Sequence, residues 1–235
     1  MKKLLITVLA LLLVGAASAK AQDKVEASVS MDLVTNYIWR GQHLGDVSMQ
    51  PSLGISYKGL SLEAWSSVGL STPSDTKELD LTLGYTIGGF SISVTDYWFD
   101  DGPDPYCNYF RYSSGATNHV FEAAIGYDFG FLSLAWYTNF FGNDMTEAGK
   151  QAFSSYFELN APFSLGGLDW NATVGAVPFA TDFYSTGRFA LTNLALSASK
   201  AIPVTDRFSI PVFAQLAANP YAKQFYFVLG ITLGI

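Results

Sequence analysis

The chain has 235 residues, of which 49% are hydrophobic, 15% are aromatic and only 14% are charged. Its 20 acidic residues outnumber its 13 basic ones, and the formal net charge of −7 argues against a nucleic-acid partner, because phosphates need a basic surface. The single cysteine, Cys107, excludes an internal disulfide framework.

Residues 1–21 have the pattern of a cleaved secretory signal peptide. Lys2 and Lys3 precede an apolar run over residues 4–14, and small residues follow it at the expected cleavage position. The run is too short for a transmembrane helix, which needs about 20 apolar residues. Cleavage leaves residues 22–235, with three fewer lysines, so 10 basic residues face 20 acidic ones and the formal charge becomes −10.

The first part of the mature chain alternates between apolar and polar residues. Within residues 25–40, Val29, Leu33 and Trp39 share one parity, whereas Glu26 and Asp32 share the other. A two-residue period is typical of a β-strand, and a tilted strand crosses a bilayer with about 9–11 residues. We therefore predict one long strand over residues 25–40.

Further segments with the same period follow along the chain. They are residues 49–58, 60–69, 78–87, 90–99, 120–128, 131–140, 153–163, 168–177, 189–201, 208–218 and 225–235. Tight turns alternate with longer links at residues 41–48, 70–77, 100–119, 141–152, 178–188 and 219–224. Short turns at one end and longer loops at the other are typical of outer-membrane barrels. We predict an all-β fold: a single antiparallel up-and-down transmembrane β-barrel of about 12 strands, with both termini periplasmic.

Aromatic residues lie on the apolar parity near the ends of these strands. They are Tyr37, Trp39, Tyr57, Tyr85, Trp98, Tyr127 and Trp170. Aromatic residues favour strands in general, but that preference does not explain their shared parity at strand ends. We predict that they form the two aromatic girdles that mark the membrane interfaces of such barrels.

The last predicted strand, residues 225–235, must pair with the first so that no backbone group stays unbonded in hydrocarbon. Through Gly230, Leu233 and Ile235 it resembles the C-terminal signal that the outer-membrane assembly machinery reads, although Ile235 replaces the usual terminal aromatic residue. The expected partners are therefore outer-membrane lipid and this machinery, and the expected location is the cell outer membrane.

The inward parity is rich in carboxylates. The residues predicted to line a pore are Glu26, Asp32, Arg40, Glu63, Asp80, Glu122 and Glu158. A 12-stranded barrel lies between filled eight-stranded barrels and open 16- to 18-stranded ones. Because an acidic wall favours cations when water fills it, we expect passive diffusion of small hydrophilic, cation-favoured solutes.

A second interpretation stays open, in which the carboxylates pair with Arg40 or Lys58 inside a filled barrel. Such a barrel would be structural or would bind partners at its surface, without conductance. Bulky residues on the inward parity would narrow any passage: Trp65, Tyr97, Tyr137, Tyr156 and Phe213. The sequence leaves open whether the long link at residues 100–119 also folds into the lumen.

Several stretches carry a resemblance to a known family. They are VSMDLVTNYIWRGQ, QPSLGISYKGLSLEAW, TNHVFEAAIGY and GAVPFATDFYSTGRFALTNLALSASK. The chain from about residue 29 to residue 235 resembles a family of porin-like outer-membrane barrel proteins of Gram-negative bacteria, whose function is uncertain. The most specific feature is Tyr37-x-Trp39-Arg40-Gly41. The resemblance implies a barrel, suggests a porin and supplies no catalytic residues.

A third interpretation is an outer-membrane lipid-modifying enzyme, because 12-stranded lipid hydrolases exist. Their chemistry needs a serine with a histidine base. The only histidines are His43 and His119, and neither stands in the His-x-Ser arrangement of those hydrolases. We therefore expect no enzymatic activity and no cofactor.

The stretch WFDDGPDPY gathers Asp100, Asp101 and Asp104 near Asp96. Oxygen-rich loops can hold calcium, but this one lacks the closing glutamate of an EF-hand loop, so we predict no metal site. Asp96 itself has the lipid-facing parity. A bulge near Thr95 would turn it away from lipid.

Overall fold

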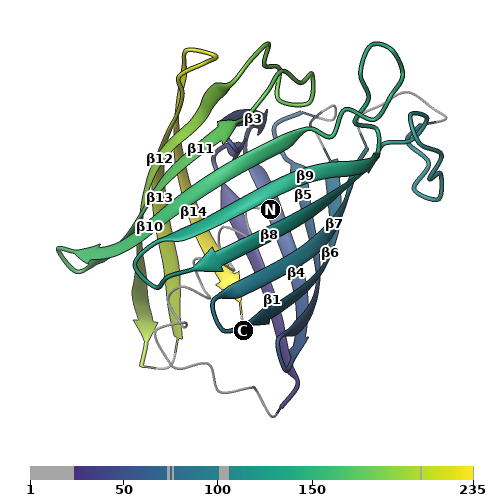
Figure 1. The fold of residues 1–235 in the computed structure, drawn as a ribbon. Helices are drawn as coiled ribbons and strands as arrows, with labels where there is room; N and C mark the ends of the chain where they lie inside the picture. Colours follow the sequence, from purple (N-terminus) through teal and green to yellow (C-terminus); the bar gives the residue numbers. More distant parts are fainter. Residues whose placement is uncertain (1–23, 73–74, 76, 101–105, 207, 235) are drawn as a thin grey trace.

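The alternating segments form one closed antiparallel sheet in the computed structural model, which describes residues 24–72, 75, 77–100, 106–206 and 208–234. Its strands are β1 Glu26–Val34, β4 Ser48–Tyr57, β5 Leu60–Gly69, β6 Lys77–Ile87, β7 Phe90–Phe99, β8 His119–Asp128, β9 Ser133–Gly142, β10 Ser155–Leu165, β11 Leu168–Val177, β12 Ala190–Thr205, β13 Phe208–Asn219 and β14 Gln224–Gly234. Figure 1 shows these strands tilted relative to the barrel axis. The predicted all-β, 12-stranded antiparallel barrel is confirmed.

Closure of the barrel depends on β1, which pairs with β4 on one side and with β14 on the other. The register places Leu33 opposite Ile231 and Met31 opposite Leu233. A closed sheet has no free edge, so the last strand must carry the same alternation as the first. The described part of the chain holds no helix long and apolar enough to cross a membrane. The signal peptide lies outside the described residues, and the sides on which the termini lie stay a prediction.

The prediction of one strand over residues 25–40 is wrong. Strand β1 ends at Val34, and the chain then leaves the wall to form a separate hairpin of β2 Tyr37–Trp39 and β3 Gln42–Gly45. The side-chain amide of Asn36 donates to the Phe227 carbonyl at 3.0 Å, and the Thr35 backbone N–H donates to the Leu229 carbonyl at 2.9 Å. These bonds to β14 fix the point at which the chain turns inward.

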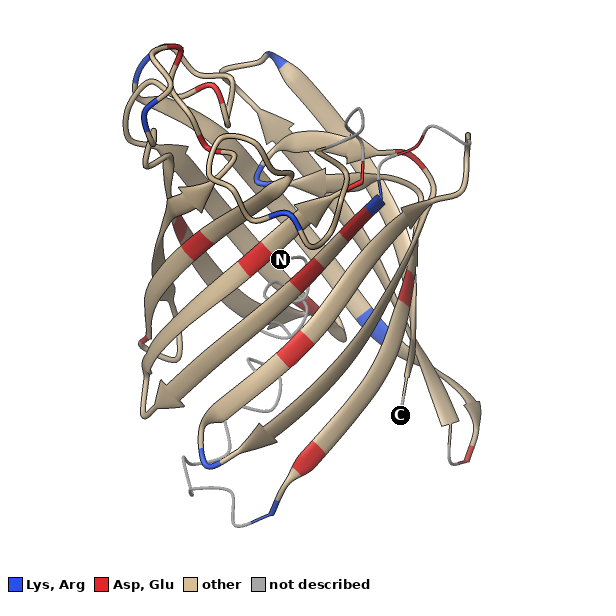
Figure 2. Cartoon of the chain, turned by 90° about the vertical axis from the view of Figure 1, so that its right-hand side faces the viewer, with Lys and Arg blue, Asp and Glu red and all other residues tan. Residues whose placement is uncertain are grey.

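The two faces of the wall differ as the period predicts. Outward side chains are apolar and exposed, with Leu53 58% exposed, Leu83 53% and Ile125 50%. The buried side chains include many polar ones, and Figure 2 shows several Asp and Glu residues midway along the strands. A soluble protein buries its apolar residues instead, so the apolar outside indicates contact with hydrocarbon.

An arginine on this outer face tests the contact with hydrocarbon. Replacing Leu83 by Arg should cost about 2–4 kcal/mol of unfolding free energy when the barrel sits in lipid vesicles, because a charge near the bilayer midplane is poorly solvated. Leu70 is equally exposed, at 54% against 53%, but lies in the link beyond β5. Leu70→Arg should therefore cost about 0–1 kcal/mol. Denaturant titration measures both, and equal effects would place the outer face in water.

Candidate functional site

The hairpin of residues 37–45, here called the lumen hairpin, lies inside the barrel near its long-loop end (Figure 1). On one side the Tyr37 hydroxyl donates to Glu78 Oε2 on β6 at 2.7 Å. On the other side the Asn219 side-chain amide, at the end of β13, donates to the Gly41 carbonyl at 3.1 Å. Strands β6 and β13 lie on opposite sides of the closed sheet. The lumen hairpin therefore crosses the barrel from wall to wall.

The tip of the lumen hairpin is Arg40-Gly41, with φ of 49° and 78°. Two successive positive φ angles are typical of a two-residue hairpin turn and favour glycine at the second position. A Cβ on Gly41 would lie 1.8 Å from the Thr192 carbonyl oxygen of β12. The tip is thus pressed against the wall, and glycine is required there by both conformation and space.

The turn directs the Arg40 guanidinium into a cage on the wall. Its Nη1 donates to Glu122 Oε2 at 2.6 Å and its Nη2 donates to Glu122 Oε1 at 3.0 Å. Nη1 also donates to the Tyr184 hydroxyl. The guanidinium carbon lies 4.0 Å from the Tyr137 ring centroid and 4.5 Å from that of Tyr156. Carboxylate bonds and aromatic faces together match the planar shape of a guanidinium.

Tyrosine hydroxyls and an amide orient the carboxylates around this cage. Tyr97 donates to Glu122 Oε1 at 2.9 Å, and Tyr156 donates to Glu158 Oε2 at 3.0 Å. The Asn160 amide donates to Glu158 Oε1 at 2.9 Å. Wall residues thus hold the acceptors in place, while Arg40 supplies the positive charge that Glu122 contacts.

The Arg40–Glu122 pair is shut away from water, with side-chain exposures of 3% and 2%. Burial opposes ionisation of Arg40, but the facing Glu122 carboxylate raises the pKa of the guanidinium overall, so it stays charged. Burial also raises the pKa of the Tyr184 hydroxyl, which therefore stays neutral. The site is an internal ion pair, and the neutral Tyr184 hydroxyl is a second acceptor for Arg40.

The structure places the predicted pore-lining residues in different surroundings. Asp32, Asp80, Glu122 and Glu158 are buried inside the cylinder. Glu63 accepts a hydrogen bond from Ser52 at 3.2 Å, and Glu26 has the same parity as Asp32 but is exposed near the start of β1. Arg40 is inside too, although on the lumen hairpin and not on the wall. Tyr184 was missed because its link, residues 178–188, has no periodic pattern.

The girdle prediction is wrong for Tyr37 and Trp39. Both are buried, at 1% and 7% exposure, because they belong to the lumen hairpin and not to the outer wall. Tyr57, Tyr85 and Tyr127 are 39–47% exposed on the outward parity. The other two predicted members, Trp170 and Trp98, also have the outward parity, and each packs against a second ring: Phe163 at 6.0 Å and Tyr109 at 5.4 Å.

Asp96 avoids lipid without a bulge. The ladders of β7 run through Thr95 without a register shift, so the bulge that the sequence left open at this point is not formed. Instead His119 Nδ1 lies 2.8 Å from Asp96 Oδ1, and the Tyr112 ring stacks on His119 at 4.1 Å. Tyr109 and Tyr112, from the link before β8, thus lie against the outer face of the wall.

Neither histidine meets a serine in the contacts that the structure gives. His119 Nε2 lies 2.6 Å from the Tyr109 carbonyl, and His43 Nε2 lies 3.2 Å from Asp46 Oδ1. Among the described residues no group of three histidine, cysteine or acidic side chains is placed to hold a metal ion. Asp101 and Asp104 lie outside the described residues, and the absence of an enzymatic activity stays a prediction.

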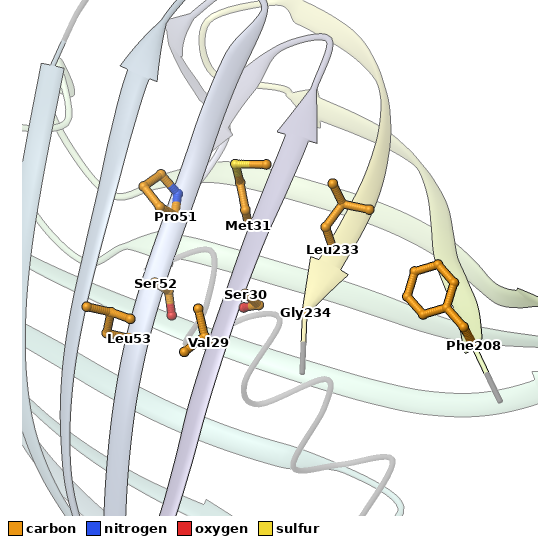
Figure 3. A pocket seen from close by; sticks show the side chains of 9 residues that line it. All are labelled: Val29, Ser30, Met31, Pro51, Ser52, Leu53, Phe208, Leu233 and Gly234. Carbon is orange, nitrogen blue, oxygen red and sulfur yellow. The ribbon is translucent and has the colours of Figure 1, made fainter.

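An apolar groove of about 560 Å³ lies on the outer wall, at the seam where β14 ends. Figure 3 shows the side chains that line it: Val29, Ser30, Met31, Pro51, Ser52, Leu53, Phe208, Leu233 and Gly234. None of these residues is charged, and serine is the only polar type. The lining of the groove suits contact with hydrocarbon, and it contains no charged side chain that could bind an ion or act as an acid or base.

Comparison with known proteins gives a family. The model of the family Gcw_chp, described as a bacterial protein of unknown function, matches residues 18–205. No curated protein matches the chain in sequence. The resemblance to a family of uncertain function is thereby confirmed, while nothing tests the Tyr37-x-Trp39-Arg40-Gly41 motif as its signature.

The solved structures that the chain is similar to include a porin and an outer-membrane channel. A porin refined at 1.8 Å resolution is 11% identical and covers 90% of this chain and 100% of its own, with a TM-score of 0.40. An outer-membrane channel from Pseudomonas putida F1 is 16% identical, with coverages of 94% and 97% and a TM-score of 0.43. The outer-membrane protein opdK from Pseudomonas aeruginosa is 12% identical, with coverages of 93% and 62% and a TM-score of 0.38.

A methyl group at the tip tests whether the lumen hairpin is docked. Gly41→Ala should displace the tip from Thr192, because overpacking costs about 1–3 kcal/mol, and hydrogen-exchange protection of residues 37–45 should fall about tenfold or more. Gly88→Ala is the matched control: Gly88 also has a positive φ, of 59°, but nothing lies within 4 Å of an added Cβ. Equal protection in the two variants would contradict the docking.

Proposed function

The chain belongs to the Gcw_chp family, whose function is unknown, and we propose that it is an outer-membrane channel for small hydrophilic solutes, with a preference for cations. The lumen hairpin closes this channel and opens it by leaving the Glu122 cage. One observation carries the proposal: a single basic hairpin crosses a lumen whose wall is acidic. The outer wall supports the membrane location, the barrel diameter supports a narrow channel, and the wall carboxylates support the preference for cations.

The outer wall supports a place in the membrane. Its exposed apolar strands suit hydrocarbon, and a closed sheet satisfies every backbone group of a lipid-embedded strand internally. The expected signal peptide supports export, and export with a β-barrel supports the outer membrane. In this proposal β14 is the segment that the assembly machinery recognises, since it completes the barrel by pairing with β1.

The size of the barrel supports a narrow channel. With strands 4.7 Å apart and tilted by about 40°, a 12-stranded cylinder is roughly 24 Å across between backbones. Inward side chains such as Trp65 and Tyr97 take up part of this width. The remaining space accommodates one hairpin, and its withdrawal leaves room for small solutes only.

The charge of the wall supports a preference for cations. Carboxylates on the inward parity come from five different strands: Asp32, Glu63, Glu78, Asp80, Glu122 and Glu158. Tyr37, Tyr97, Tyr156 and Asn160 are neutral donors to three of them. Rings of acidic side chains select cations in channels because their negative charge attracts cations and repels anions.

A filled barrel without conductance is the second candidate, and the bidentate Arg40–Glu122 pair is the observation that favours it. A hairpin held this firmly is able to serve as a permanent structural core. The two candidates differ in one respect only, namely whether the lumen hairpin leaves the cage.

Removing the lumen hairpin decides between the channel and the filled barrel. Val34 and Ser48 already pair across β1 and β4, so a short Gly–Ser link can replace residues 37–45 without strain on the wall. In planar bilayers this variant should conduct steadily, with a reversal potential that favours cations, whereas the intact protein should open rarely. The matched control shortens the exposed link at residues 146–150 with the same Gly–Ser sequence and should behave like the intact protein. Silence of the hairpin-less variant, once inserted, would establish the filled barrel.

A further inference from the structure

The cage around Arg40 is built from parts that do not move with the lumen hairpin. Glu122, Tyr137 and Tyr156 stand on the wall strands β8, β9 and β10, and Tyr184 stands in the link between β11 and β12. Of the described groups that contact the guanidinium, Trp39, at 4.7 Å, is the one that belongs to the hairpin itself. Withdrawal of the hairpin therefore removes the Arg40 guanidinium and leaves the groups that bind it, here called the receptor.

From this geometry we infer that the cage is a binding site for a free solute that carries a guanidinium group, and that Arg40 occupies it as an internal substitute. The inference rests on the proposed function and deepens it, because it names the solute class that the channel recognises. A solute held at this point lies in the passage that the lumen hairpin otherwise closes.

The contacts favour guanidinium over other cations. Two parallel N–H donors meet the two oxygens of Glu122 at 2.6 and 3.0 Å, an arrangement that a planar fork satisfies and that a tetrahedral ammonium does not. The rings of Tyr137 and Tyr156 lie 4.0 and 4.5 Å from the guanidinium carbon, which suits a flat cation. An ammonium ion keeps the charge attraction but loses the second bond and the stacking.

The receptor keeps its shape without Arg40, because wall residues hold its parts. The Tyr97 hydroxyl fixes Glu122 Oε1 at 2.9 Å. The Tyr156 hydroxyl is bonded to Glu158 and lies over Gly175 of β11, where a Cβ would be 1.7 Å from the hydroxyl oxygen. Glycine at this position therefore makes room for the Tyr156 side chain, and the receptor is formed before a solute arrives.

Competition between solute and Arg40 would couple binding to opening. A free guanidinium binds only where Arg40 has left, so it shifts the population toward the withdrawn hairpin by its differential affinity for the two states. The channel would then be opened by the solutes that it recognises. This coupling of binding to opening arises because Arg40 and the solute compete for the same cage, so no second, distant site is needed.

Chemical rescue tests the site without measuring conductance. Arg40→Gly removes the guanidinium and keeps a residue that accepts the φ of 49° at this position. Methylguanidinium should raise the thermal unfolding midpoint of this variant in detergent micelles, and methylammonium should bind about tenfold more weakly, because it lacks the bidentate bond. The intact protein should respond far less, since Arg40 occupies the cage.

The double variant Arg40→Gly/Glu122→Gln is the matched control and should lose the preference for methylguanidinium. If Arg40→Gly does not fold, the hairpin-less variant offers the cage without Trp39 for the same titration. Equal affinity for the two probes, or a preference that survives Glu122→Gln, would overturn the site. Failure of rescue in a variant that conducts would leave the channel in place and reject this inference alone. If methylguanidinium stabilises Arg40→Gly but the barrel never conducts, the guanidinium site stands and the channel is rejected.

Discussion

The buried ion pair between Arg40 and Glu122 is the interaction on which the interior depends. A lone carboxylate in a closed interior is costly, and removal of one partner of a buried pair costs about 3–5 kcal/mol. The hydroxyl of Tyr97 supplies a hydrogen bond to Glu122 but no positive charge. Arg40 supplies that charge, and it reaches Glu122 only because the chain turns inward after Val34. The pair therefore determines both where the first link lies and how the long-loop end of the barrel is closed.

The width of the barrel and the presence of the lumen hairpin depend on each other. Twelve strands enclose more space than their inward side chains fill, and a two-residue turn at Arg40-Gly41 is narrow enough to enter it. A mostly aromatic hydrophobic cluster packs beside this turn; its members are Tyr37, Trp39, Trp65, Tyr137, Tyr156, Val177 and Tyr184. Apolar residues thus cover the outside, and an aromatic and acidic layer surrounds the hairpin inside. This separation gives the protein a lipid-facing surface and a polar interior at the same time.

The sequence predicts the wall well because a period of two allows only two faces. Leu53, Leu83 and Ile125 lie outside as expected, and Asp80 and Glu158 lie inside. The same rule fails at Tyr37 and Trp39, because both belong to a hairpin inside the lumen, where Tyr37, Ile38 and Trp39 are all buried whatever their parity. A hairpin turn at Arg40-Gly41 is the signal that would have separated them, since a long strand does not tolerate two positive φ angles. Tyr184 and the His119 contact of Asp96 come from links without any period, and only the folded chain brings them to their partners.

A double-mutant cycle on the ion pair tests the central claim most directly. Arg40→Met and Glu122→Gln are measured singly and together by denaturant unfolding in detergent micelles. Groups in direct contact commonly show coupling free energies of about 0.5–3 kcal/mol, and for this buried bidentate pair we expect a value in the upper part of that range. In that case the double variant loses about 2–3 kcal/mol less unfolding free energy than the sum of the losses of the two single variants. A coupling near zero would mean that Arg40 does not contact Glu122, and it would contradict both the closed lumen and the cage.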